Sequence, residues 1–484
     1  MPLVIGLDIG TTTITAIAVG DGGIVRLSRT LPNEAETTSP ADEARGYCEW
    51  DAEKILAIAL HALRELARDL GDDARQVVGL AVTGQQHGVV VIDHALHAVS
   101  PFINWQDHRA AELCPASGRS YSDEAISRIG EARYSELGCW PLPGYMAATL
   151  FWLDAKSMLP KQTLAVFIVD FIAARLTSSV PVTDSTLAAS AGVLNLQTLS
   201  WDTAAIHALG LSPSLFPEVR PTGTSYNHVS NDIAHSIGLP KGVPVFVGLG
   251  DHQASFLGGA SEPERCIFIN VGTGAQVAVM AGNSRCNPSF ELRPFPGGKL
   301  ERASPWHPGG HVYALLAEFF EQVGTQLFET HLPATTLFHR LNQMAARVPQ
   351  GADGMTCEPF FGGNRWNPGA AGEWTKITEH NFTPGHMTRA LLEGMARSLH
   401  SGLDKLMTRL DHQPDLVIGA GNGIRENPLF AEILAREFGR PVQVPHHREE
   451  AAYGAAIVTA VGAGLLPDFA AAKSWIRYDA SLSR

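Results

Sequence analysis

Two short turns in this sequence combine glycine with threonine, and each follows an alternating apolar segment. Gly10, Thr11, Thr12 and Thr13 follow the segment 4–9, and Gly272 and Thr273 follow the segment 267–271. Backbone N–H groups and threonine hydroxyls in a tight turn can donate to phosphate oxygens without a cationic surface. The two turns are therefore candidate phosphate-binding sites.

Two aspartates stand beside predicted strands. Asp8 lies just before the first turn, where its carboxylate could hold a hydrated Mg²⁺ or, equally well, cap the turn. Asp251 follows the apolar run 243–250. It could be a base at the carboxyl edge of a sheet, where ligands of α/β proteins bind, or the N-cap of a short helix over 252–258. The residues around Asp251 alone favour the cap.

Strands and helices alternate along the chain. The segments 4–9 and 14–19 predict a β-hairpin, and the segments 77–82, 89–92, 243–249 and 416–421 predict further strands. Helices are predicted after Asp51, from Pro384 to about Leu410, and over 428–438. This alternation is typical of an α/β fold.

The first hairpin has a second copy. Shifting it by 262 positions places Ile5 on Ile267, Gly10 on Gly272 and Asp8 on Asn270. Repetition of a unit half a chain apart predicts two domains with related cores. A loop-rich stretch that ends near Gly242 predicts the boundary, which gives domains 1–242 and 243–484.

Composition limits the classes of protein that the chain can belong to. It has 484 residues with a formal net charge of −13, 45% hydrophobic and 18% charged residues, and six cysteines. This balance excludes disorder and coiled coil, and the acidic surface argues against a nucleic-acid partner. No two cysteines form CxxC, and the uncharged stretch 451–466 is short for a membrane span. We expect a soluble, cytoplasmic protein without a membrane partner.

Several common site motifs are absent. No Walker phosphate loop, dinucleotide GxGxxG, GxSxG or HExxH occurs in the sequence. His446, His447, Glu449 and Glu450 could ligate a metal, but an exposed polar loop is the favoured interpretation because no ligand spacing is met.

A series of motifs, in order along the chain, resembles the FGGY carbohydrate kinases. The motifs are Leu7-Asp8-Ile9-Gly10-Thr11-Thr12, Thr83-Gly84-Gln85-Gln86-His87-Gly88, Trp105-Gln106-Asp107-His108-Arg109, Gly248-Leu249-Gly250-Asp251-His252-Gln253, Pro359-Phe360-Phe361-Gly362-Gly363-Asn364-Arg365 and Gly419-Ala420-Gly421-Asn422-Gly423. The resemblance runs from about Leu3 to Val461. It implies two duplicated ribonuclease H-like domains of the actin and hexokinase type, with a hinge near Gly242 and an interdomain cleft.

Within that family the chain is most similar to the sedoheptulokinase branch, through the Gln86-His87 motif, Trp105-Gln106-Asp107, the stretch 144–153 and Asp251-His252-Gln253. Three positions depart from common family patterns. Gln86 stands where many ketose kinases have Met, His252 where ketopentose kinases often have Asn, and Asn364 where Glu is common. A xylulokinase-like ketopentose kinase therefore remains an alternative.

The resemblance implies ATP-dependent phosphorylation of a sugar hydroxyl and assigns roles by motif. Asp251 is the catalytic base, and Asp8 holds Mg²⁺. The residues expected at the sugar are Gln86, His87, Trp105, Asp107 and His252. Those expected at the nucleotide are Gly10, Thr11, Thr12, Thr13, Gly272, Thr273, Gly310, Gly421 and Asn427. The expected cofactors are ATP and Mg²⁺, and a homodimer is compatible with the resemblance.

Two readings of other classes stay open. An actin-like ATPase would use the phosphate turns but gives no role to Trp105 or Asp251. A non-catalytic sugar-binding regulator is disfavoured because Asp8 and Asp251 are both present. ADP release stimulated by a sugar distinguishes the kinase from both.

Overall fold

A computed structural model describes residues 1–304, 307–362 and 370–479, and the chain in it forms two compact units. The first unit contains Met1–Glu262, Ser284–Glu301 and Glu449–Ile476, and the second contains Pro263–Asn283, Arg302–Arg448 and the chain from Arg477 on. Two segments from the second half of the chain therefore complete the first unit. The domain boundary near Gly242 stays a prediction.

The first unit is built on a six-stranded sheet in the order β13-β14-β5-β1-β2-β3. Its strands are β1 (Leu3–Ile9), β2 (Thr13–Val19), β3 (Val25–Pro32), β5 (Val77–Gly84), β13 (Ser225–His228) and β14 (Pro244–Gly250). β1 and β2 form the predicted antiparallel hairpin, while β5 runs parallel to β1 on one side and to β14 on the other.

Helices and short strands surround this sheet in the first unit. The helices are α1 (Pro40–Glu43), α2 (Ala52–Leu70), α3 (Tyr121–Ile129), α4 (Tyr134–Leu137), α5 (Met146–Ala155), α6 (Ile168–Thr177), α7 (Ser185–Ala189), α8 (Thr203–Ala208), α9 (Asn231–Ile237), α10 (Asp251–Gly259) and α16 (Glu450–Gly462). The shorter strands are β4 (Glu49–Trp50), β6 (Val90–Ile92), β7 (Phe102–Ile103), β8 (Leu164–Val166), β9 (Val182–Thr183), β10 (Leu194–Asn195), β11 (Ser200–Trp201) and β12 (Glu218–Val219). The hairpin of β17 (Glu291–Phe295) and β18 (Lys299–Ala303) continues the sheet of β16 (Gly274–Ala281) and β15 (Cys266–Val271), although residues Ser284–Glu301 group with the first unit.

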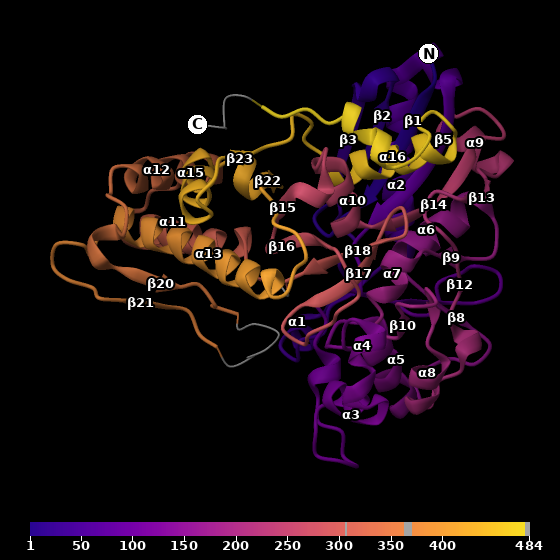
Figure 1. The fold of residues 1–484 in the computed structure, drawn as a ribbon, viewed down its shortest axis with the longest axis horizontal. Coiled ribbons are helices and arrows are strands. Elements are labelled where there is room, and N and C mark those ends of the chain that lie inside the picture. Colours follow the sequence, from indigo (N-terminus) through magenta and orange to yellow (C-terminus); the bar gives the residue numbers. More distant parts are fainter. Residues whose placement is uncertain (305–306, 363–369, 480–484) are drawn as a thin grey trace. The chain divides into compact units, whose positions relative to one another are not determined.

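Helix α16 packs on one face of the sheet although it comes from the far end of the chain (Figure 1). Thr459 donates its hydroxyl to the carbonyl O of Ile5 at 2.9 Å, and a Cβ at Gly6 would lie 1.9 Å from the carbonyl O of Ala452. Because side chains alternate along a strand, Ile5, Leu7 and Ile9 point to the other face, where they share a core with α2. The predicted helix after Asp51 is thus confirmed, and most of the uncharged stretch 451–466 lies in the buried helix α16.

The second unit repeats the hairpin design. β15 (Cys266–Val271) pairs antiparallel with β16 (Gly274–Ala281) and parallel with β22 (Leu416–Ala420), which is parallel to β23 (Val442–Gln443). The remaining elements are β19 (His307–Pro308), β20 (Thr356–Glu358), β21 (Glu373–Thr375), α11 (Gly310–Phe328), α12 (Ala334–Ala346), α13 (Pro384–Met407), α14 (Asn422–Arg425) and α15 (Pro428–Glu437). The predicted α/β fold with a duplicated hairpin is confirmed. None of the described helices is both long and apolar enough for a membrane span.

Glycines allow α10 and α16 to approach each other closely. A Cβ at Gly454 would lie 2.0 Å from the carbonyl O of Ala254 in α10, and one at Gly258 would lie 2.2 Å from the carbonyl O of Glu450. Since Asp251 begins α10, this contact also fixes the helix that carries the candidate base.

We predict that Gly454→Ala lowers the free energy of unfolding by about 1–3 kcal/mol, because the added methyl group forces the two helices apart. Urea denaturation followed by circular dichroism measures this change. Gly282→Ala is the control, since its Cβ would lie no closer than 3.4 Å to its neighbours. A G454A variant as stable as the wild type would contradict the close approach.

Candidate active site

The two candidate aspartates lie at the same edge of the first unit's sheet. The register aligns Ile9 of β1 with Gly84 of β5, and Gly84 with Gly250 of β14. Asp8 precedes that row by one residue, and Asp251 follows it by one. Because the carboxyl ends of parallel strands meet at one edge, residues 243 positions apart in the sequence come together.

Asp251 is the first residue of α10 and not its N-cap. The N-cap is Gly250, and the N–H of His252 donates to Asp251 Oδ1 at 2.8 Å. Burial raises the pKa of Asp251 to about 6, while the His252 N–H and the charge of Arg293 oppose the shift. The group is mostly a carboxylate at pH 7 and is basic enough to accept a proton.

Asp8 faces other negative charges. Its Oδ1 is buried, and it has no hydrogen-bond partner among the described residues. Burial raises the pKa of Asp8 well above its ordinary value, and the carboxylates of Asp251 and Glu449 raise it further. A cation placed there would relieve both the burial and the repulsion.

From the sequence, Glu449 is a candidate metal ligand, although an exposed polar loop is the favoured interpretation. It precedes α16, and its Oε2 accepts a hydrogen bond from the Thr15 hydroxyl at 3.5 Å. His446 and Arg448 are exposed, as the interpretation of a polar loop expected, but Glu450 is buried. The long-range packing of α16 on the first sheet gives Glu449 its place, so local sequence could not indicate that this carboxylate acts on Asp8.

Gln86 lies directly against the residue before Asp251. A Cβ at Gly250 would be 1.7 Å from Gln86 Nε2, so only glycine at 250 leaves room for this amide. Gln86 Nε2 donates to Gln253 Oε1 at 2.7 Å, and Gln86 Oε1 accepts from Arg293 Nη1 at 2.9 Å. The structure thus brings Gln86 next to Asp251, as a shared site requires.

His87 adopts a backbone conformation that is rare outside glycine, with φ of 72°. Its backbone N–H donates to Ser190 Oγ at 3.1 Å, its Nδ1 lies 3.0 Å from the carbonyl O of Ser190, and its ring stacks on Tyr145 with centroids 4.0 Å apart. A carbonyl oxygen only accepts, so Nδ1 carries the proton. Nε2 is therefore an acceptor, 3.4 Å from Arg293 Nη2.

Trp105 connects the first phosphate turn to the segment after β7. Its indole Nε1 donates to Thr11 Oγ1 at 3.0 Å, and the Thr11 hydroxyl lies 3.4 Å from Gln85 Oε1. Asn33 supports the turn by donating its side-chain amide to the carbonyl O of Gly10 and its N–H to that of Thr12. Thr12 is exposed, and Thr13 begins β2.

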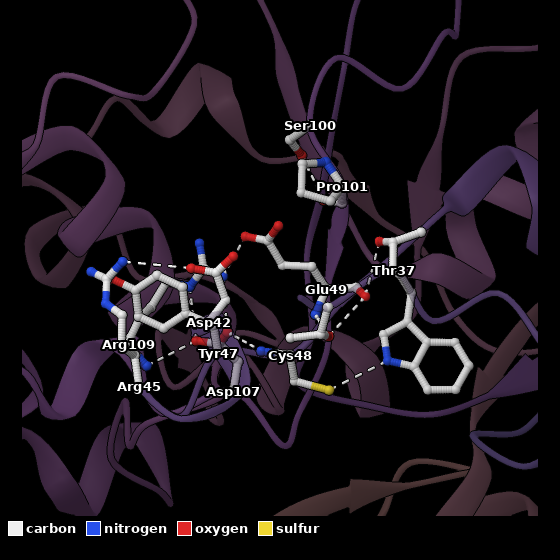
Figure 2. Close-up of polar contacts among 12 residues, drawn as sticks. Thr37, Asp42, Arg45, Tyr47, Cys48, Glu49, Ser100, Pro101, Asp107 and Arg109 are labelled. Atoms are coloured by element: carbon white, nitrogen blue, oxygen red, sulfur yellow. Dashed lines mark hydrogen bonds and ion pairs between the residues drawn. The ribbon is translucent and has the colours of Figure 1, made fainter. Parts of the chain in front are cut away.

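Asp107 is fully buried and engaged within the chain. Figure 2 shows it beside Arg109: Oδ1 accepts from Arg109 N at 2.9 Å and Nε at 2.8 Å, and Oδ2 accepts from Cys48 N at 2.7 Å. Arg109 also donates to Glu49 Oε1 at 2.6 Å and lies over the Tyr47 ring. This pair braces β4 and β7, and a sugar contact by Asp107 stays a prediction.

His252 and Glu301 form a buried pair behind Asp251. His252 Nε2 lies 3.5 Å from Glu301 Oε1, and the two residues are 4% and 0% exposed. Burial lowers the pKa of His252 to about 3 and raises the pKa of Glu301 to about 8. Both side chains are therefore mainly uncharged at neutral pH.

The nucleotide candidates of the second unit converge at one end of β15. Gly310 N donates to the carbonyl O of Gly272 at 2.8 Å, and His311 N donates to that of Thr273 at 3.0 Å, so α11 starts against the turn. Gly421, with φ of 83°, has its Cβ position 2.5 Å from the carbonyl O of Val271. The N–H groups of Gly310 and His311 are thus used within the chain, and the helix start would favour a phosphate through its dipole.

Asn427 lies on a different helix, α15, where it is the N-cap. Its Oδ1 accepts a hydrogen bond from Phe430 N at 3.1 Å. Its nucleotide contact stays a prediction. Within the motif 359–365, residues Gly363, Asn364 and Arg365 lie outside the described residues.

Comparison with protein families identifies the chain. Residues 3–258 match the N-terminal domain of the FGGY family of carbohydrate kinases, and residues 268–463 match its C-terminal domain. The protein belongs to the FGGY family. It is therefore a carbohydrate kinase, a phosphotransferase with an alcohol acceptor, and the readings as an actin-like ATPase or a non-catalytic regulator are set aside.

Individual FGGY relatives are distant but match over nearly the full length. The chain is 24% identical to a gluconokinase of Bacillus subtilis over 98% of this chain and 90% of the relative, and 27% identical to a human sedoheptulokinase over 94% and 97%. The solved xylulose kinase of Lactobacillus acidophilus superposes with a TM-score of 0.84 at 20% identity, covering 99% of this chain and 93% of that one. These relatives carry different names, so similarity alone does not select the sugar.

Side chains of the β17–β18 hairpin were missed by sequence reasoning. Glu291 accepts a hydrogen bond from the Tyr145 hydroxyl, and Arg293 donates to Gln86. Glu301 accepts from Gln253. Their segment contains no recognisable motif, and it joins the first unit only through tertiary packing.

Glu301 gives the site a pH-dependent stability. Its pKa is about 8 in the folded protein against an ordinary value of 4.5, so the folded state keeps a proton that the unfolded chain releases. The free energy of unfolding therefore falls as pH rises between these two values. Glutamine does not titrate, so Glu301→Gln removes this fall with pH. We predict that the free energy of unfolding of E301Q, minus that of the wild type, increases from pH 5 to pH 8 by at most about 1.4 kcal/mol per pH unit.

Urea denaturation at each pH measures the difference between E301Q and the wild type. Glu131→Gln, at an exposed glutamate, should follow the wild type at every pH. A difference between E301Q and the wild type that does not vary with pH would contradict a raised pKa of Glu301.

Proposed function

We propose that this FGGY kinase transfers the γ-phosphoryl group of ATP to a hydroxyl of a neutral sugar, a ketose such as sedoheptulose. The observation that carries the proposal is the position of Asp251, a buried carboxylate with a pKa of about 6 at the carboxyl edge of the sheet, next to Gln86. A base and a hydrogen-bonding amide side by side suit a hydroxyl acceptor.

In the proposed reaction, Asp251 accepts the proton of the attacking hydroxyl while the hydroxyl oxygen bonds to the γ-phosphorus and ADP leaves. Phosphoryl transfer depends mainly on positioning and charge stabilisation. Gln86, His87, Trp105 and His252 would orient the sugar. Beyond its bonds to Gln253 and Arg293, Gln86 has a second amide N–H and a second lone pair on Oε1, and His87 Nε2 can accept a hydrogen bond from a sugar hydroxyl.

Mg²⁺ fits the residues around Asp8. The unpartnered Asp8 Oδ1 and the negative charges of Asp251 and Glu449 favour a cation there. The described residues include no cluster of three His, Cys, Asp or Glu side chains suited to a metal ion, so Asp8 would hold Mg²⁺ largely through water, as this ion prefers. When bound, Mg²⁺ would neutralise charge on the phosphates.

The phosphates of ATP would use the two Gly-Thr turns. Gly10, Thr11, Thr12 and Thr13 offer donors in the first unit. In the second unit Thr273 would be the donor, while Gly272 and Gly310, whose N–H groups donate within the chain, would shape the turn. Gly421 and Asn427 would lie at the remainder of the nucleotide. Support comes from the start of α11 against the Gly272–Thr273 turn, because a helix start is a favourable place for an anion.

A neutral sugar is favoured over a sugar acid by how the nearby arginines are engaged. Arg293 is paired with Glu291, and Arg109 is paired with Asp107 and Glu49. A carboxylate substrate would need one of these cations to change partners, at a cost in free energy. This argument disfavours gluconate, and the motifs that resemble the sedoheptulokinase branch, such as Gln86-His87 and Asp251-His252-Gln253, favour a ketose. A ketopentose such as xylulose is the alternative.

A coupled ADP-release screen across C3 to C7 polyols, aldoses, ketoses and aldonates tests the proposal. We expect the highest kcat/KM with a ketose and little turnover of gluconate. A preference for gluconate would contradict the neutral-sugar argument, and sedoheptulose against xylulose decides the chain length.

Asp251→Asn should retain nucleotide and sugar binding and lose turnover by about 10²–10⁴-fold, the usual contribution of a positioned base. In the wild type, kcat/KM should fall as pH drops through about 6, because protonated Asp251 cannot accept the hydroxyl proton. Steady-state kinetics and calorimetric titration measure both effects. Asp21→Asn, at an exposed aspartate, is the control. A D251N variant that keeps more than half the wild-type rate would exclude Asp251 as the base.

A further inference from the structure

The β17–β18 hairpin places three charged side chains in the interior of the first unit. Glu291, Arg293 and Glu301 are 4%, 1% and 0% exposed. By sequence the hairpin lies in the C-terminal family domain, and its strands continue the sheet of β16 and β15, but residues Ser284–Glu301 group with the first unit. Burial of charge is costly unless each group is paired or hydrogen-bonded, so these contacts must be specific.

Arg293 contacts several side chains around the proposed sugar site at once. Nε donates to Glu291 Oε2 at 2.8 Å, Nη1 donates to Gln86 Oε1 at 2.9 Å, and Nη2 lies 3.3 Å from the Tyr145 hydroxyl and 3.4 Å from His87 Nε2. Glu291 also accepts from the Tyr145 hydroxyl. The guanidinium is thus neutralised by Glu291 and holds both Gln86 and His87.

A hydrogen-bond chain of fixed direction begins at Arg293. A guanidinium has donors only, so Gln86 must turn its Oε1 toward it and its NH₂ group away. That NH₂ group donates to Gln253 Oε1 at 2.7 Å, and Gln253 Nε2 donates to Glu301 Oε1 at 2.8 Å. One arginine therefore sets the orientation of both buried amides.

This chain joins the two elements that carry the proposed chemistry. Gln86 follows β5 and lies against Gly250, while Gln253 is in the first turn of α10, two residues after Asp251. A rotation of the Gln86 amide would exchange donor and acceptor at the sugar, and it would also break the contact with Gln253.

We propose that Arg293 is a positioning residue for the sugar, which acts through Gln86 by fixing the orientation of its amide. The proposal rests on the proposed function, in which Gln86 contacts the sugar. Arg293 makes no such contact itself, and Glu291 serves to neutralise it.

Kinetics of single and double variants test this role. Arg293→Lys keeps the charge but cannot hold Glu291, Gln86 and His87 in the same planar geometry. We expect R293K to raise the KM for the sugar about tenfold or more and to leave the KM for ATP within about twofold, as expected for loss of a charge-assisted hydrogen bond. Arg302→Lys is the matched control, because Arg302 is 1% exposed on the same hairpin but donates to the carbonyl groups of Leu406 and Thr408.

A double-mutant cycle with Gln86→Ala separates positioning from general packing. If Arg293 acts through Gln86, R293K changes the sugar KM by less than about twofold in the Q86A background. Full additivity of the two effects, or equal changes in the KM values of sugar and ATP, would overturn the proposal. The neutral double variant E291Q/R293M should reproduce the sugar effect, and it guards against misfolding caused by an unpaired buried charge.

Crystal structures of the ligand-free wild type and of E291Q/R293M provide a readout that needs no turnover. We expect the Gln86–Gln253 hydrogen bond in the wild type and its loss or reversal in the variant. Retention of the same amide orientation in the variant overturns the role of Arg293, whatever the substrate. Absence of sugar turnover in the wild type, with the amide orientation lost in the variant, instead contradicts the proposed function and leaves the orienting role of Arg293 supported.

Discussion

The register of three parallel strands is the constraint on which the proposed site depends. β1, β5 and β14 end on one row, and Asp8, Gln86 and Asp251 extend from that edge. The Gln86 amide lies against the backbone of Gly250, in space that any side chain at position 250 would fill. A shift of one residue in any of the three strands would turn its polar side chain away from the others.

Buried charge is the second organising feature of the first unit. Asp107 with Arg109 and Glu291 with Arg293 bring carboxylates and guanidinium groups out of water, and each pair is completed by further hydrogen bonds. Such pairs are a weak source of stability but fix geometry strongly. The second pair leaves an amide and an imidazole, those of Gln86 and His87, held by a neutralised guanidinium.

Much of the fold could be predicted from local pattern. The hairpin 4–19, its copy at 267–280 and the helices after Asp51 and Pro384 follow from alternation, apolar spacing and capping residues. These signals work because they depend on neighbours within one element. The effect of Glu449 on Asp8 and the contributions of the β17–β18 hairpin had no local signal, since packing between distant segments creates them.

The sequence by itself determined the α/β class, the duplicated hairpin and the motifs of the FGGY kinases, because short-range spacing encodes them. Only the tertiary structure decided that Asp251 begins its helix and does not cap it, that Asp107 is held by Arg109, and that Arg293 donates to Gln86. Hydrogen-bond partners and burial depend on which distant groups share a space. The same aspartate can be a cap, a buried structural partner or a base, and the groups that the fold places around it select among these roles.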